Sequence, residues 1–205
     1  MIRVIVGSQE KRFAVYKELL CEHSEFCRAA CGREWKEGQE DTIYLPEARP
    51  DAFNLYIHWL YTGTVDTTLM TEPEVPPGTV ARHPAHSNLA KVFVLGNFLG
   101  DIAFCNCLID CILQKLDKGG IPPSPQTLSY VWRQTSKGSR FQLLFFDLFA
   151  ALVNHTIFET KLTQYPPDLV VDLAIRFVRG GGRMCPKFKD RCRYHTHKEG
   201  EETCP

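Results

Sequence analysis

The fold is decided by the stretch Val4–Gly63, which has the sequence VIVGSQEKRFAVYKELLCEHSEFCRAACGREWKEGQEDTIYLPEARPDAFNLYIHWLYTG. Around its start, Ile2–Val6 and Arg12–Tyr16 alternate apolar and polar residues, and this alternation predicts two strands joined as a hairpin. Apolar residues at helical spacing follow, with Ser24 as the predicted N-cap between two short helices. Thr42–Pro46 predicts a third strand, which the proline ends. Together these elements predict a small mixed sheet flanked by helices.

Outward from this stretch, the pattern changes from helix to loop and back to helix. Pro50 predicts a helix start, because a proline at the first position loses no hydrogen bond, and Gly63 predicts its end. Residues 64–87 are polar and proline-rich without an apolar period, which is typical of a long surface loop. Helices are then predicted at residues 88–99 and 102–116. The order of elements predicts an α/β (α+β) domain.

Several short motifs in this order resemble the BTB/POZ domains that are abundant in filamentous fungi. Those domains contain a VG turn, F-x-V-H-K-x-L-L-C-x-x-S-x-F-F, F-K-E-G, I-x-L-P and W-L-Y-T-G. The matching residues here are Val6, Gly7, Phe13, Val15, Lys17, Leu19, Leu20, Cys21, Ser24, Phe26, Trp35, Lys36, Glu37, Ile43, Leu45, Pro46 and Trp59–Gly63. The segment Lys91–Asp110 resembles the helix pair that closes the domain. Tyr16 departs from the family, which usually has histidine there. The resemblance predicts a BTB/POZ domain over residues 1–118.

The resemblance implies a scaffold that binds other proteins, itself included. Some relatives are substrate adaptors that dock a cullin scaffold of a ubiquitin ligase through the face near the W-L-Y-T-G helix. Such adaptors often carry a hydrophobic-x-acidic motif just beyond that helix, which Met70 and Glu72 fit; the alternative is a solvated loop. Trp59, Tyr61, Met70 and Glu72 are therefore the candidate partner-binding residues. Long-form relatives have an earlier helix and strand that swap between protomers. No such elements precede Ile2, so the oligomeric state stays open.

Beyond a Gly/Pro-rich boundary, residues 119–183 predict a helical extension. Ser124 and Pro125 predict a helix start, and residues 141–153 are apolar nearly all round, which favours a buried central helix. A third helix is predicted at 167–179, with the apolar residues Leu169, Val170, Leu173 and Phe177. The extension would support a cullin scaffold or complete the core.

The tail, residues 184–205, has the character of a metal site. It contains Cys185, Cys192, His195, His197 and Cys204. Zinc prefers four thiolate or imidazole ligands in a tetrahedral array, and Cys192 and His195 have knuckle spacing. With Cys204 returning to them, either Cys185 or His197 would be the fourth ligand. A structural zinc in this tail is one hypothesis; a disordered tail and redox chemistry are the others. No cofactor is otherwise required.

Composition and motifs exclude several functions. Lys plus Arg equals Asp plus Glu, at 24 each, so bulk charge predicts neither nucleic-acid nor membrane binding. No apolar run approaches the roughly 18 residues of a membrane span, and no signal peptide begins the chain. We therefore expect a cytoplasmic or nuclear protein. The nine cysteines, odd in number and mostly in apolar segments, indicate reduced thiols.

The sequence predicts a binding protein and not an enzyme, because it contains no G-x-S-x-G, H-E-x-x-H or P-loop motif. The leading hypothesis is a protein–protein interaction module, acting in homo-oligomerisation and partner recruitment. The alternative is a zinc-bearing nuclear regulatory protein whose Cys/His tail is the working part.

Overall fold

The computed structural model describes residues 1–32, 41–70, 84–116, 120–179, 188–197, 200 and 204. Its contacts divide the chain into two compact units. The first unit contains Met1–Val75 and Lys91–Leu108, and the second contains Pro76–Ala90 and Ile109–Pro205. The boundary expected at residues 118 and 119 lies outside the described residues, so the three-part division stays a prediction.

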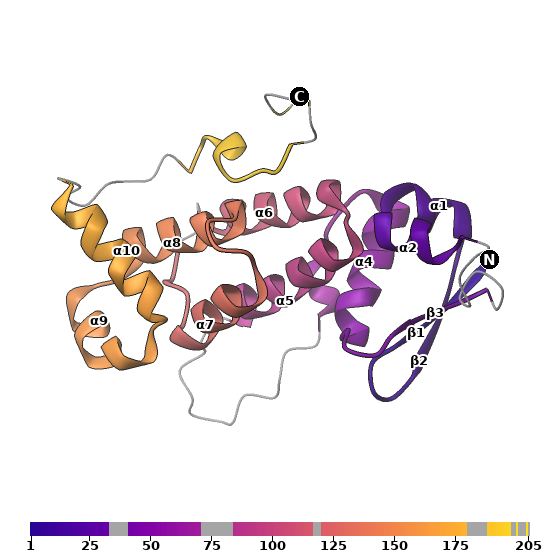
Figure 1. Cartoon of the computed structure of the whole chain (residues 1–205), viewed down its shortest axis with the longest axis horizontal. Coiled ribbons are helices and arrows are strands. Elements are labelled where there is room, and N and C mark those ends of the chain that lie inside the picture. The colour runs from indigo at the N-terminus through magenta and orange to yellow at the C-terminus, as the bar shows by residue number, and fades with distance from the viewer. Residues whose placement is uncertain are drawn as a thin grey trace. The chain divides into compact units, whose positions relative to one another are not determined.

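The sheet of the first unit has three strands in the order β2-β1-β3 (Figure 1). They are β1 (Ile2–Val6), β2 (Lys11–Val15) and β3 (Thr42–Leu45). β1 pairs antiparallel with β2 and parallel with β3, so that Val4 lies opposite Phe13 on one side and Ile43 on the other. Ile2, Val4 and Val6 are buried, because alternate residues of a strand share one face. The small mixed sheet is confirmed.

The helices of the first unit begin and end near the predicted residues. They are α1 (Lys17–His23), α2 (Glu25–Ala30), α4 (Pro50–Thr62) and the 3-10 turn η1 (Thr67–Leu69), with the parts of α5 (Pro84–Leu99) and α6 (Ile102–Leu116) that belong to this unit. Ser24 caps α2 as predicted, accepting a hydrogen bond from the Cys27 N–H at 3.0 Å. Gly63 ends α4 with a φ of 67°, a left-handed conformation that glycine adopts without strain. α5 begins at Pro84, earlier than the predicted residue 88.

Aromatic side chains of α4 and α6 fill the core of the first unit. The Phe104 ring centroid lies 4.9 Å from that of Tyr56 and 5.1 Å from that of Trp59. Gly96 permits this packing, because a Cβ there would lie only 2.7 Å from Phe104 Cδ1. The buried carboxylate of Asp101 accepts hydrogen bonds from the Tyr56 hydroxyl at 3.0 Å and from the Phe104 N–H at 2.9 Å. The Asp101 carboxylate and the Tyr56 hydroxyl are thus hydrogen-bonded inside an apolar core.

The second unit is helical over residues 120–179. Its helices there are α7 (Pro125–Gln134), α8 (Arg140–Leu152), α9 (His155–Lys161), the 3-10 turn η2 (Leu162–Gln164) and α10 (Pro167–Val178). Further along lies the 3-10 turn η3 (Arg191–Arg193). Ser124 caps α7 as predicted, accepting from the Thr127 N–H at 3.2 Å. The buried apolar residues of α8 are Phe141, Leu144, Phe145, Leu148 and Phe149, which confirms a buried central helix.

One expectation for this region is wrong. The sequence predicts three helices, but the structure adds α9, which Asn154 caps by accepting from the Ile157 N–H at 2.8 Å. Phe177, one of the apolar residues of the predicted third helix, is 76% exposed. Leu169 is buried, and the inward position near the end of α10 belongs to Arg176, which pairs with Asp147. The inward side of α10 therefore includes Arg176, whose partner is the buried carboxylate of Asp147. A count of apolar residues does not detect such a pair.

Among the described residues, no single helix is long and apolar enough to span a membrane. Arg140–Leu152 and His155–Gln164 pass this test together, but they are bent by 118° at their junction.

Candidate functional site

Helix α4 carries two of the candidate partner-binding residues on different sides. Trp59 is only 7% exposed and packs its ring against His23, at 5.2 Å between centroids, and against Phe104. Tyr61 is 48% exposed. Two residues along a helix are separated by about 200° around its axis. Trp59 therefore belongs to the core, and Tyr61 is the exposed one of the two candidate residues on α4.

Tyr61 forms an exposed aromatic pair with Tyr16, which precedes α1. Tyr16 is 56% exposed, and the two ring centroids lie 6.2 Å apart at an interplanar angle of 64°. The Tyr16 backbone N–H donates a hydrogen bond to the Tyr61 hydroxyl oxygen at 3.3 Å. Tyrosines are enriched in protein interfaces, since they combine a large apolar ring with a polar end. No motif of the sequence drew attention to Tyr16 as a binding residue.

The other two candidate residues lie just beyond α4. Met70 follows η1 and is 7% exposed, so its side chain is packed within the first unit. Glu72 lies outside the described residues. Because the hydrophobic member of the motif is buried, only a rearrangement of this segment would present it to a partner. The docking role of these two residues stays a prediction.

The C-terminal segment, defined here as residues 188–197, 200 and 204, gathers four of the five predicted metal ligands. The ligand atoms of Cys192, His197 and Cys204 all lie within 4.8 Å of one another. His195 Nδ1 lies 3.1 Å from Cys204 Sγ. Cys185, the alternative fourth ligand, lies outside the described residues. The structure thus brings together two thiols and two imidazoles.

Two further contacts organise this cluster. The Cys204 backbone N–H donates to Cys192 Sγ at 3.0 Å. On the far side of the His195 ring, Nε2 lies 3.2 Å from Asp110 Oδ1 of α6. Burial lowers the pKa of His195, although the Asp110 carboxylate opposes this shift. Burial, followed by the side-chain interaction of its thiol with Cys192, raises the pKa of Cys204 to about 11. Both shifts favour the neutral forms of the His195 ring and the Cys204 thiol.

Asp147, in the middle of α8, is a buried residue that the sequence analysis missed. Its carboxylate accepts hydrogen bonds from Arg176 Nη1 at 2.5 Å, Arg193 Nε at 3.1 Å and the Tyr194 hydroxyl at 2.9 Å. Arg193 and Tyr194 precede His195, so this network, the Asp147 clasp, holds the chain next to the Cys/His cluster. A signal was present, because Asp147 is the one acidic residue in the apolar helix RFQLLFFDLFAAL.

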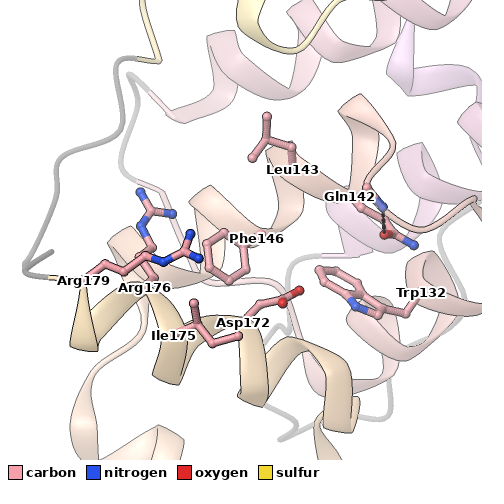
Figure 2. A pocket seen from close by; sticks show the side chains of 9 residues that line it. Trp132, Gln142, Leu143, Phe146, Asp172, Ile175, Arg176 and Arg179 are labelled. Atoms are coloured by element: carbon pink, nitrogen blue, oxygen red, sulfur yellow. Dashed lines mark hydrogen bonds between the residues drawn. The ribbon is translucent and has the colours of Figure 1, made fainter.

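A solvent-accessible cavity of about 430 Å³ lies among residues of α7, α8 and α10 (Figure 2). The Arg176 guanidinium lies 5.0 Å from the centre of the Phe146 ring and also pairs with Asp147. The residues that line the cavity are Trp132, Gly138, Gln142, Leu143, Phe146, Asp172, Ile175, Arg176 and Arg179. Because this lining contains no cysteine, histidine or hydroxyl side chain, it offers none of the usual nucleophile–base pairs of hydrolases.

The model of the BTB/POZ domain family matches residues 2–77. This match covers the three strands, α1, α2, α4 and η1, so the N-terminal part of the chain is a BTB/POZ domain. BTB/POZ domains are protein-interaction modules, and the aromatic pair Tyr16–Tyr61 lies within the matched residues. A comparison with curated proteins finds no match.

Proposed function

We propose that this chain recruits other proteins, and copies of itself, through its BTB/POZ domain, and that one partner is a cullin scaffold of a ubiquitin ligase. The observation that carries the proposal is the exposed pair Tyr16–Tyr61 on a domain of the BTB/POZ family. Such adaptors act in the cytoplasm and the nucleus, which is where we place this protein. We also propose that the domain is of the BTB/POZ type found in filamentous fungi.

The aromatic pair has the physical properties of an interface anchor. Both rings expose about half of their surface, yet Tyr61 belongs to a helix and its hydroxyl accepts a backbone hydrogen bond from Tyr16. A partner therefore buries a large apolar area while immobilising few rotatable bonds. Side chains of this kind contribute about 2 kcal/mol or more when they lie at the centre of an interface.

Affinity purification of the tagged full chain from its own cells, with mass spectrometry, tests the adaptor hypothesis. We expect a cullin and ubiquitin-ligase components to co-purify, and Tyr61→Ala to reduce their recovery at least about tenfold. Tyr44→Ala is the matched control, because Tyr44 is 51% exposed on β3 of the same domain. Absence of any cullin from the wild-type sample would refute the adaptor role, and equal loss in both variants would refute the assigned surface.

The hydrophobic-x-acidic motif requires a different variant. Substitution of Met70 would create a cavity in the first unit, since the side chain is buried. Glu72→Gln removes only the charge and is the cleaner test. We expect weaker cullin recovery from Glu72→Gln with an unchanged melting temperature.

Self-association is tested by sedimentation of the purified chain over a range of concentrations. We expect a concentration-dependent dimer, and a monomer at every concentration would exclude self-association as an activity of the isolated chain.

A second candidate function, a zinc-bearing regulatory protein of the nucleus, is favoured by the cluster of Cys192, His197 and Cys204. In that case the C-terminal segment is the working part. Fluorescent full-length fusions with Cys192→Ser and Cys204→Ser distinguish the two candidates. Loss of nuclear or DNA association, with partner recovery retained, would favour the regulatory function.

A further inference from the structure

The C-terminal segment has few apolar contacts with which to hold its fold. Among its described residues only Tyr194 and His195 are buried, and Tyr194 is fixed by its hydrogen bond to Asp147. A segment of this kind needs further bonds to be ordered, and metal ligation supplies them in small domains without an apolar core. Its cysteine and histidine side chains are gathered at one place, as described above.

We propose that Cys192, His195, His197 and Cys204 bind one structural Zn²⁺, and that Asp110 orients His195 toward it. The metal would fasten the C-terminal segment to α6. The proposal concerns a part of the chain outside the BTB/POZ match and is independent of partner recruitment.

The distances between the donor atoms fit a site that closes on a metal. Zn–S bonds of about 2.3 Å and Zn–N bonds of about 2.0 Å in a tetrahedron separate neighbouring ligand atoms by about 3.5 Å. His195 Nδ1 and Cys204 Sγ, at 3.1 Å, already lie near that separation. His197 Nε2 lies 4.0 Å from the same sulfur. The ligand atoms of Cys192, His197 and Cys204 lie within 4.8 Å of one another, so side-chain rotations that move them by about 1 Å bring these three to ligating distances, and His195 joins them through its contact with Cys204.

Asp110 supplies the contact that metal-binding histidines usually have. A ligating imidazole donates its second ring N–H to a carboxylate or carbonyl oxygen, which fixes its tautomer and orientation. His195 Nδ1 points to the cysteine sulfur, and Nε2 lies 3.2 Å from Asp110 Oδ1. Neither His195 Nε2 nor Asp110 Oδ1, both buried, has a well-aligned hydrogen bond among the described residues. A metal at Nδ1 would turn the ring, and the N–H at Nε2 would then pair with the carboxylate.

The sulfur atoms also have a favourable environment for ligation. Zinc binds the thiolate, and a backbone N–H directed at sulfur stabilises that anion. The Cys204 N–H donates to Cys192 Sγ at 3.0 Å, so one ligand residue supports the other. Two sulfur and two nitrogen donors in a tetrahedron select zinc over magnesium and calcium, which prefer oxygen.

The experiment uses the full-length chain, purified under reducing conditions, demetallated and titrated with Zn²⁺ or Co²⁺. We expect one equivalent of metal to bind and Co²⁺ to give the intense visible absorption of a tetrahedral site with a thiolate charge-transfer band. Cys192→Ser and Cys204→Ser should abolish that band. Cys185→Ser tests the choice of fourth ligand and should retain it, as should the control Cys21→Ser in the first unit.

Asp110→Ala tests the orienting role without removing a ligand. We expect it to bind Zn²⁺ about 10- to 100-fold more weakly while the Co²⁺ spectrum stays tetrahedral. Absence of a thiolate band in the titrated wild type would overturn the proposal, and so would a band that survives Cys192→Ser and Cys204→Ser. Loss of the band in Cys185→Ser would overturn the assigned ligand set. Partner recovery by the BTB/POZ domain is measured on the same samples, so failure of the metal site and failure of the proposed function are distinguished.

Discussion

In the first unit, the buried carboxylate of Asp101 accepts hydrogen bonds from two neutral groups, the Tyr56 hydroxyl and the Phe104 N–H, and the His23 ring lies 3.9 Å away. In the second unit, the buried carboxylate of Asp147 has two guanidinium partners, Arg176 and Arg193. The first unit thus surrounds a polar group with an apolar core, whereas the second uses a charged group to hold distant segments together. Two carboxylates that are equally buried are therefore stabilised by different interactions, and the two units should respond differently to the same kind of substitution.

The largest difference is expected from removing the charge at Asp147. Asp147→Ala leaves Arg176, only 18% exposed, without its anion and breaks the Asp147 clasp. Removing one partner of a buried ion pair costs about 3–5 kcal/mol, and the partial exposure of Arg193 places the expected loss near the lower end. Urea unfolding of the full chain measures this free energy.

Asp168→Ala is the control, because its pairing with Lys137 at 3.4 Å is exposed. Such surface pairs contribute roughly 0–1 kcal/mol. An Asp147→Ala loss no larger than that of the control would mean that the clasp does not hold the second unit together.

The core of the first unit should instead be sensitive to volume. Gly96→Ala places a methyl group 2.7 Å from Phe104 Cδ1 and 3.1 Å from Cys105 Sγ. Overpacking of this kind costs about 1–3 kcal/mol. The smaller side chain of Phe104→Leu should restore part of the loss when combined with Gly96→Ala, as measured by melting temperature. Additive losses in the double variant would contradict a direct clash between these residues.

Two tyrosine-to-phenylalanine variants sharpen the comparison of the carboxylates. Tyr56→Phe leaves Asp101 with one fewer hydrogen bond and no guanidinium partner, and we expect a loss of about 2 kcal/mol. Tyr194→Phe leaves Asp147 paired with both arginines, so we expect about 1 kcal/mol or less. Urea unfolding of the two variants gives the order, and the reverse order would show that the guanidinium pairs do not compensate Asp147.

The same contrast explains which elements and contacts of the fold could be predicted from the sequence. The strands, the Ser24 cap, the Gly63 helix end and the buried α8 follow from local periods and local hydrogen bonds, which a sequence displays directly. The partners of Asp147 are 29 to 47 residues away in the chain, and no local period encodes such a pairing. For that reason the apolar residues of α10 do not by themselves show that Arg176 faces inward while Phe177 is exposed.

For the candidate site, the sequence indicated which residue types take part better than it indicated which distant residues lie beside them. Cysteine and histidine spacing indicated the candidate ligands Cys192, His195 and Cys204, which the structure brings together. Asp110 was not found, because it comes from α6, 85 residues before His195. Side-chain exposure was the property that the sequence predicted least well. Met70 lies in a segment that is polar and typical of a surface loop, yet it is buried.

The smallest effect concerns the pH dependence of the first unit. Burial raises the pKa of Asp101 above its usual value near 4, although its hydrogen bonds with the Phe104 N–H and Tyr56, and His23 at 3.9 Å, oppose the shift. A group with a raised pKa in the folded state stabilises the fold fully below its unfolded pKa, and this stability is lost as pH rises through the folded pKa. Asp101→Asn does not titrate, so its melting temperature relative to the wild type should rise as the pH increases from about 4 through the raised folded-state pKa of Asp101. His23, the nearest titratable cation, is the control: the rise should persist in the His23→Gln background. A constant difference between the Asp101→Asn variant and the wild type across this range would mean that Asp101 is no harder to ionise in the folded chain than in the unfolded one. The first unit would then stabilise its carboxylate as well as the second does, and the contrast between the two units would be lost.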